Sequence, residues 1–209
     1  AIDLGVDTAI FCPGDPPPGL REKLGIPDGC RVLLYAGRLA PEKNVGVLFS
    51  AFTELNERAP GRYRLVVVGD GTWRSQLLRL KESTGNLSWV PYCSSPRELA
   101  DIYRCADLFV HPGIQETFGL VTLESQACAT PVVGIRGSYM DRIIFSDQFH
   151  WARENSPRAL ADAIESKFGS DLAGMGAAAS RAVRERFSWN HAFERIFSAY
   201  SRIVSEDGG

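Results

Sequence analysis

Two basic residues, Arg38 and Lys43, lie between an apolar segment and the first turn of an amphipathic one. A helix N-terminus carries a partial positive charge of its own, so two cations placed there would form a compact site for a phosphate or pyrophosphate. The arginine offers a planar fork of donors and the lysine a point charge. The alternative is that both are solvated surface charges, with Glu42 offsetting one of them. Their spacing leaves both interpretations open.

The segment 112–124 could supply the rest of such a site. Its first carboxylate, Glu116, falls in a loop, and Gly119 then lets the chain turn into a helix. The backbone N–H groups of Phe118, Gly119 and Leu120 would have no partner within that helix and would be free to bind an anion.

A second carboxylate, Glu124, falls inside the same predicted helix, beside the apolar residues Leu123 and Ala127. Burying a carboxylate without a partner is costly, so we expect a hydroxyl-bearing partner for it. The vicinal hydroxyls of a ribose would suit this role. The alternative is an ion pair with a nearby arginine such as Arg38.

Three further features are weaker signals. Gly69-Asp70-Gly71 permits a sharp turn and a close ligand approach, but tight turns that bind nothing use the same residues. The loop 134–140, with Gly137-Ser138 as its flexible point, is only suggestive. His111 ends a predicted strand near the site, where it could line the site or only pack or cap the strand.

The elements that position these residues alternate along the chain. Apolar runs of strand length are followed by segments with helical periodicity, such as Val45, Leu48, Phe49, Phe52 and Leu55. We predict strands at 31–37, 63–69, 87–90, 107–111 and 131–135, and helices from 45, at 73–82, 96–105 and 118–128. From residue 156 the pattern is helical throughout, at 156–168, 171–187 and 188–204.

Continuously apolar strands separated by helices predict an α/β fold with a parallel sheet and right-handed crossovers. We expect a Rossmann-like, doubly wound sheet with a helical C-terminal tail. Ligands of such sheets bind beyond the carboxyl ends of the strands, which is where the candidate segments fall. We divide the chain into a linker at 1–18, a Rossmann-like domain at 19–187 and a C-terminal helix at 188–209.

Composition excludes several classes of protein. The 209 residues are 44% hydrophobic and 23% charged, with a net charge of −2 and a pI near 6.0. No basic stripe is available for nucleic acid, and no apolar run approaches the roughly 18 residues of a spanning helix. The chain begins at Ala1 rather than Met, so we expect a piece of a longer protein. We predict a cytoplasmic location and leave membrane contact of the whole protein open.

The five cysteines are odd in number and form no C-x-x-C pair, which argues against disulfides and against zinc. We expect most of them to be small buried residues in a reducing compartment. They are Cys12, Cys30, Cys93, Cys105 and Cys128.

Taken together, these segments resemble the carboxy-terminal domain of glycosyltransferase family 4, which has the GT-B fold, over nearly the whole chain. Residues 34–43 (LYAGRLAPEK) match the phosphate-binding loop of that family, and 67–71 (VVGDG) its second strand and turn. Residues 116–124 (ETFGLVTLE) carry the E-x7-E pattern with its internal Phe-Gly. That pattern arises often by chance, but here it stands in register with the other elements.

The resemblance implies a role for each matching residue. Arg38 and Lys43 would hold the donor diphosphate and stabilise it as a leaving group, and Glu116 would contact hydroxyls of the transferred sugar. Glu124 would bind the ribose. The donor would also contact backbone around Gly37, Gly69, Gly71, Phe118, Gly119 and Leu120, and its base would meet the loop Tyr92-Cys93-Ser94.

The resemblance also implies a reaction. The donor would be a UDP-, GDP- or ADP-sugar, and a separate N-terminal domain of the same protein would hold the acceptor. A hexosyl group would be transferred with retention of configuration, without a metal ion or any other cofactor. The sequence contains no D-x-D motif, in agreement with a metal-independent reaction. By itself this chain should bind nucleotide and catalyse nothing.

Some positions depart from the family, and two other functions remain open. Ala129 replaces a usual glycine, Gly137-Ser138-Tyr139-Met140-Asp141 replaces a Gly-Gly-x-x-Glu pattern, and 146–153 does not resemble the usual apolar strand and acidic turn. These changes leave the sugar identity open. A nucleotide-sugar epimerase of the GT-B fold would share the phosphate site. A non-catalytic nucleotide-binding domain is the other alternative.

Overall fold

The computed structural model describes residues 5–116, 118–145 and 148–206. Its centre is a five-stranded sheet in which every neighbouring pair of strands is parallel. The strands are β1 (Arg31–Ala36), β2 (Tyr63–Val68), β3 (Leu87–Val90), β4 (Leu108–Val110) and β5 (Val132–Val133). This arrangement confirms the predicted Rossmann-like fold class.

The strand order is β3-β2-β1-β4-β5, so the chain first winds outward from β1 in one direction and then returns to its other side. The crevice between the carboxyl ends of β1 and β4 is therefore the topological switch point, where parallel α/β sheets bind their ligands. In the register, Leu33 lies opposite Leu108 and Leu34 opposite Phe109. The loops that follow β1 and β4 thus leave the sheet side by side.

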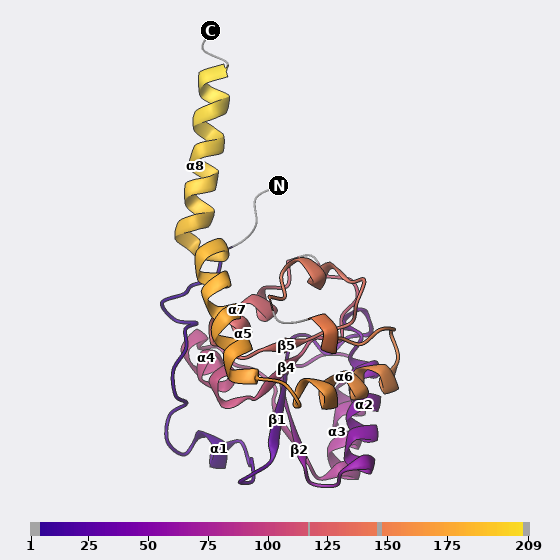
Figure 1. Ribbon diagram of the computed structural model, residues 1–209. Helices are drawn as coiled ribbons and strands as arrows, with labels where there is room; N and C mark the ends of the chain where they lie inside the picture. The colour runs from indigo at the N-terminus through magenta and orange to yellow at the C-terminus, as the bar shows by residue number, and fades with distance from the viewer. Residues whose placement is uncertain (1–4, 117, 146–147, 207–209) are drawn as a thin grey trace.

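Helices cover both faces of the sheet and bury two separate apolar clusters (Figure 1). One face is covered by α2 (Val45–Arg58), α3 (Arg74–Thr84) and α6 (Pro157–Lys167). The other is covered by α1 (Leu20–Lys23), α4 (Pro96–Cys105), α5 (Leu120–Ala127) and α7 (Leu172–Phe187). In α2, the five apolar residues with helical spacing are all buried, as their periodicity predicted.

The three helices predicted after residue 156 have different places in the fold. The helix α6 packs against α2, and α7 packs against α5, so both belong to the layers over the sheet. Only α8 (Trp189–Glu206) extends away from the body (Figure 1). Periodicity alone could not separate these cases, because a helix that packs on a sheet and one that projects can share the same apolar spacing.

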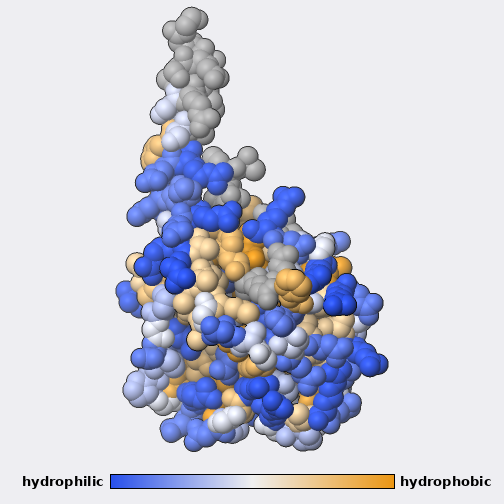
Figure 2. Space-filling model, viewed as in Figure 1, coloured by the Kyte–Doolittle hydropathy of each residue, from blue (hydrophilic) through white to orange (hydrophobic). Residues whose placement is uncertain are grey.

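The described part of the chain also contains three short 3₁₀ helices: η1 (Pro41–Lys43), η2 (Tyr139–Arg142) and η3 (Gln148–His150). Figure 2 shows apolar side chains gathering on the body below the base of α8, whereas hydrophilic ones dominate its lower half. Within the described residues, no helix has both the length and the apolar content for a membrane crossing.

Candidate functional site

The loop that follows β1 places Arg38 and Lys43 differently. The Tyr35 hydroxyl, at the end of β1, donates a hydrogen bond to the Arg38 carbonyl at 2.9 Å and so fixes the backbone of the loop. The Arg38 side chain is 65% exposed and pairs with Glu42 at 2.7 Å. Glu42 therefore offsets Arg38, as the alternative interpretation held, and an exposed pair of this kind contributes little to stability.

Lys43 points the other way, toward the loop that follows β4. Its ammonium forms a short ion pair with Glu116, whose side chain is only 11% exposed. The next residue, Asn44, donates to the Pro112 carbonyl at 2.7 Å and so ties the same two loops together. The sequence predicted both charged residues of the ion pair, but not that they meet.

These loops and the start of α5 enclose a pocket of about 350 Å³ at the switch point. Its lining includes predicted site residues from both segments, namely Gly37, Arg38, Lys43, Glu116, Phe118, Gly119 and Leu120. Tyr35, Ala36, His111, Pro112 and Val121 complete it. Thr117, inside the E-x7-E pattern, lies outside the described residues. Two cations, a carboxylate and a helix N-terminus thus share one cavity.

The turn into α5 depends on Gly119. Its φ is 65°, in the left-handed region, and a Cβ there would lie 2.5 Å from Ile143 Cδ1 and 2.7 Å from Met140 Cε. Glycine therefore lets the chain turn sharply while the buried Met140 packs beneath it. Since α5 begins at Leu120, the first N–H groups of the helix face the pocket without intrahelical acceptors.

Glu124, on the second turn of α5, does have a hydroxyl partner, but the partner is part of the protein. The Tyr103 hydroxyl, from the fully buried side chain on α4, donates to Glu124 Oε2 at 3.1 Å. Burial raises the pKa of Glu124, and the Tyr103 hydrogen bond partly opposes that shift. The alternative partner, Arg38, pairs with Glu42 instead. Neither Glu124 nor Tyr103 lines the pocket at the switch point, so the ribose-binding role of Glu124 stays a prediction. The sequence analysis missed Tyr103 as the partner of Glu124, because a tyrosine on an amphipathic helix is usually core.

Gly69 and Gly71 pack one loop against another and do not line this pocket. Gly69 has φ 125°, and a Cβ there would lie 2.1 Å from the Gly37 carbonyl oxygen. A Cβ on Gly71 would lie 2.3 Å from the Leu39 carbonyl oxygen. The structure thus gives both glycines a packing role, and their predicted contact with a donor stays a prediction.

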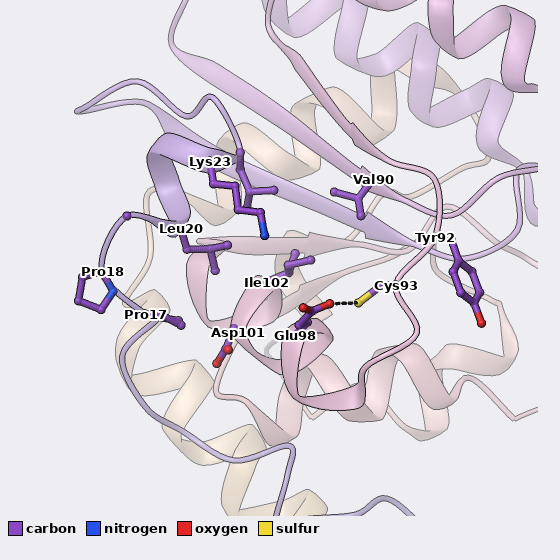
Figure 3. A pocket seen from close by; sticks show the side chains of 12 residues that line it. Pro17, Pro18, Leu20, Lys23, Val90, Tyr92, Cys93, Glu98, Asp101 and Ile102 are labelled. Carbon is purple, nitrogen blue, oxygen red and sulfur yellow. Dashed lines mark hydrogen bonds between the residues drawn. The ribbon is translucent and has the colours of Figure 1, made fainter.

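The predicted base-binding loop lies apart, at the carboxyl end of β3. Tyr92 and Cys93 line a second pocket, of about 380 Å³, between α1 and α4 (Figure 3). Figure 3 shows the Cys93 thiol turned toward Glu98, with Sγ 4.0 Å from Oε2, while the Tyr92 ring points away and is 81% exposed. Burial raises the pKa of the Cys93 thiol. Ser94, the next residue, is exposed.

His111 is the other residue whose role the sequence left open. It directly follows β4, lines the pocket at the switch point and is 4% exposed. Its Nε2 lies 4.0 Å from Glu116 Oε1, and its Nδ1 has no hydrogen-bond partner. Burial lowers the pKa of His111 to about 4; Glu116 opposes the shift and Lys43 adds to it. The imidazole is therefore neutral near pH 7.

The segments in which the sequence departs from the glycosyltransferase family pattern pack against α5. In η2 the Asp141 carboxylate accepts a hydrogen bond from the Gly137 amide at 3.0 Å, and Met140 is fully buried. The buried Gln126 side chain joins α5 to the backbone of Ile143 and Phe145. Of the divergent segment 146–153, residues 146 and 147 lie outside the described residues. Ala129 has φ 64°, a left-handed conformation that favours glycine.

The cysteines and the acidic residues were the remaining candidates for a special site. All five cysteines are free thiols, and only Cys105 and Cys128 are buried, so the expectation that most are buried was too broad. Over the part of the chain that the structure describes, no group of three or more His, Cys, Asp or Glu side chains could hold a metal ion.

Comparison with known proteins places this geometry in context. The family described as "Glycosyl transferases group 1" matches residues 18–171. D-inositol 3-phosphate glycosyltransferase of Acidothermus cellulolyticus is 34% identical over 217 residues, which cover 98% of this chain and 48% of the relative. A second such enzyme, from Kineococcus radiotolerans, is also 34% identical over 98% of this chain and 52% of its own length. The chain spans about half the length of the curated relatives it matches.

Solved structures share the fold. Sucrose-phosphate synthase from Thermosynechococcus elongatus superposes with a TM-score of 0.80 at 22% identity, over 98% of this chain and 52% of that one. The Anabaena protein HepE, in complex with UDP-glucose, gives a TM-score of 0.78 at 20% identity, over 95% of this chain and 56% of its own. At these identities the likeness shows the fold, which is that of one half of a GT-B enzyme.

Proposed function

The chain belongs to the group 1 glycosyl transferases, and from this membership we propose that it is the donor-binding domain of a family 4 glycosyltransferase of the GT-B fold. It binds a nucleotide-diphosphate sugar and supports transfer of the glycosyl group. The observation that carries this proposal is the convergence of Arg38, Lys43, Glu116 and the N-terminus of α5 on one pocket at the switch point.

In this proposal the diphosphate lies against the cations and the first N–H groups of α5. Negative charge that develops on the leaving diphosphate is stabilised there, by donors already in position before the reaction. Each charge-assisted contact contributes roughly 1.5–3 kcal/mol. No step requires a metal ion, and transfer proceeds with retention of configuration, as the family resemblance implies.

The carboxylates recognise hydroxyl groups. Glu116, at the wall of the pocket, accepts hydrogen bonds from the transferred sugar, and Glu124 accepts them from the ribose. The Tyr103 hydrogen bond to Glu124 Oε2 supports this assignment, because it holds the carboxylate in one orientation and leaves Oε1 for a ligand. The base then reaches the loop Tyr92-Cys93-Ser94. That UDP and UDP-glucose are bound by HepE favours a nucleotide-sugar donor here.

The acceptor belongs to a second, N-terminal domain of the whole protein. The relatives are about twice as long as this chain, which supports such a domain. The C-terminal helix of our domain division, 188–209, would pack toward it; residues 207–209 of that range and 1–4 of the linker lie outside the described residues. Apolar side chains of α8 remain exposed for that contact: Trp189, Phe193, Phe197 and Tyr200.

Titration calorimetry of the chain with UDP, GDP and ADP, and with UDP-glucose, GDP-mannose and ADP-glucose, tests the proposal. We expect one nucleotide series to bind and the other two to bind at least tenfold more weakly, or about 1.4 kcal/mol. Loss of binding in the Lys43→Ala variant would assign the site. A chain that binds none of the six compounds would contradict the proposed function.

A further inference from the structure

One polar side chain of the pocket has no role in the function proposed above. His111 is anchored by its backbone N–H, which donates to the Val133 carbonyl on β5 at 2.9 Å. Its ring is buried, and a Cβ on Gly113 would lie 2.9 Å from His111 Cε1, so backbone closes over that side of the ring. The ring therefore has little freedom to move, and the direction of each nitrogen is set by the fold.

The surroundings select one tautomer of this ring. A neutral imidazole has one N–H and one acceptor nitrogen. Nδ1 makes no hydrogen bond, although the backbone of His111 and Gly113 lies near the ring, and with the proton on Nδ1 the lone pair of Nε2 would face the Glu116 carboxylate. A proton on Nε2 faces that carboxylate instead, which is electrostatically favourable. Burial, which keeps the ring uncharged, leaves this Nε2–H as its single donor.

Glu116 has two neighbours that can donate to it, and they differ in mobility. Lys43 is in contact with Glu116 Oε1, whereas Nε2 of His111 stands 4.0 Å from the same oxygen. Lys43 is a flexible side chain that a diphosphate in the pocket would attract away from Glu116. A carboxylate that is 11% exposed would then lose its cation, and an unpaired buried carboxylate is costly.

We propose that His111 is a positioning residue of this site: it donates Nε2–H to Glu116 and holds that carboxylate in place when a diphosphate draws Lys43 away. The second half of this statement rests on the proposed function. Closing the 4.0 Å gap to a hydrogen bond of about 2.9 Å takes a shift of about 1 Å, which the side chain of Glu116 can supply. Besides Glu116, the ring interacts with the charge of Lys43 and with the backbone of His111 and Gly113.

The first test needs no ligand. Long-range ¹H–¹⁵N correlation spectra of the histidine-labelled chain report the tautomer of each imidazole, and the His111→Gln variant identifies the His111 signals among those of the three histidines. We expect the neutral Nε2–H tautomer from pH 5.5 to pH 8, and a change in its ¹⁵N shift in Glu116→Gln. An Nδ1–H tautomer, or protonation with a midpoint above pH 6, would overturn the proposal.

The second test separates positioning from simple packing. Calorimetry compares UDP with UDP-glucose, or the corresponding pair if the panel above selects another nucleotide. His111→Leu should weaken UDP binding, because the diphosphate then leaves Glu116 without a partner, and should weaken UDP-glucose about tenfold more than UDP, because only the sugar binds Glu116. His111→Gln, which keeps an N–H donor near the position of Nε2, should recover most of that loss.

Equal weakening of both ligands in His111→Leu, or no recovery in His111→Gln, would contradict the positioning role. Thermal unfolding of both variants checks that they fold. If the wild-type chain binds no nucleotide at all, the proposed function fails. The proposal that His111 replaces Lys43 as the partner of Glu116 then fails as well. The tautomer measurement still decides whether His111 donates to Glu116, so the two failures can be told apart.

Discussion

The loops that follow β1 and β4 differ in one respect from the loop that follows β2, although all three leave the same edge of one sheet. The first two carry charged side chains into a shared pocket, with Lys43 of one paired to Glu116 of the other. The third carries glycines that allow its backbone to approach the first within packing distance. The Leu39 amide donates to the Asp70 carbonyl at 3.0 Å, and the Trp73 amide to the Leu39 carbonyl at 3.0 Å.

The segments that resemble the glycosyltransferase family therefore contain two kinds of residue: glycines that set the loop packing, and charged residues that line the pocket. Gly69 and Gly71 determine how close the loops can come, and hence where Arg38 and Lys43 are held. Arg38 and Glu116 carry charge into the pocket, and under the proposed function they act on a ligand. Substitutions in the two groups should therefore affect different measurements.

The largest effect is expected for Gly69→Ala. The new Cβ would lie 2.1 Å from the Gly37 carbonyl oxygen, at a backbone φ of 125°, so the loops must separate. We expect the free energy of unfolding to fall by about 3 kcal/mol or more, as measured by denaturant unfolding. Gly61→Ala is the matched control: φ is 76° with nothing within 4 Å, so the loss should be about 1 kcal/mol. Equal losses would show that loop packing is not the cause.

Arg38→Ala should show the opposite behaviour. The side chain is 65% exposed and pairs only with Glu42 among the described residues, so stability should change by less than about 1 kcal/mol. Nucleotide affinity should fall about tenfold to a hundredfold, the loss of one charge-assisted contact. Arg62→Ala, an exposed arginine at the opposite edge of the sheet, should change neither property. Unchanged affinity in Arg38→Ala would remove Arg38 from the site.

Glu124→Gln tests a proposed site residue whose burial, when it is charged, destabilises the fold. Burial raises the pKa of Glu124 above its ordinary value of 4.5, so the folded state holds this proton more tightly than the unfolded state. The protonated Glu124 therefore contributes its full stabilisation below pH 4.5. This stabilisation is lost as the pH rises through the raised pKa of the folded state. The stability of the wild type relative to Glu124→Gln should therefore fall as the pH rises above 4.5.

Tyr103→Phe sharpens the same measurement. Without the hydrogen bond at 3.1 Å, the pKa of Glu124 should rise further, and the loss of stability should continue to higher pH. Nucleotide affinity should weaken in Glu124→Gln if this carboxylate binds the ribose. A pH profile that is the same in wild type and Glu124→Gln would contradict the assigned shift.

The smallest effect is expected at Ala129. Its backbone has a positive φ, as that of Gly69 does, but the residue is not a glycine. With φ at 64°, Ala129→Gly should relieve strain and stabilise the fold by about 1 kcal/mol, measured as a rise in Tm of about 2–4 °C. The control Ala51→Gly, inside α2, should destabilise it by about 1 kcal/mol. Destabilisation by both substitutions would show that Ala129 is not strained.

The sequence by itself determined the fold class and the edge of the sheet at which chemistry is placed. The spacing of apolar residues is a local property, so the five strands and the longer helices could be predicted within a few residues, including β1, β2 and α2. The short helix α1 was missed, because four residues are too few for periodicity to show. The segments that line the pocket were predicted for the same local reason, since each follows a strand.

Only the tertiary structure decided which polar groups meet. Lys43 and Glu116 are 73 positions apart, and Tyr103 and Glu124 are 21 positions apart on different helices. The strand order, which puts β4 beside β1, brings the first pair together, and packing of α4 against α5 brings the second. Hydrogen bonds and ion pairs depend on distances of a few ångströms between such segments, and no local pattern in the chain records those distances.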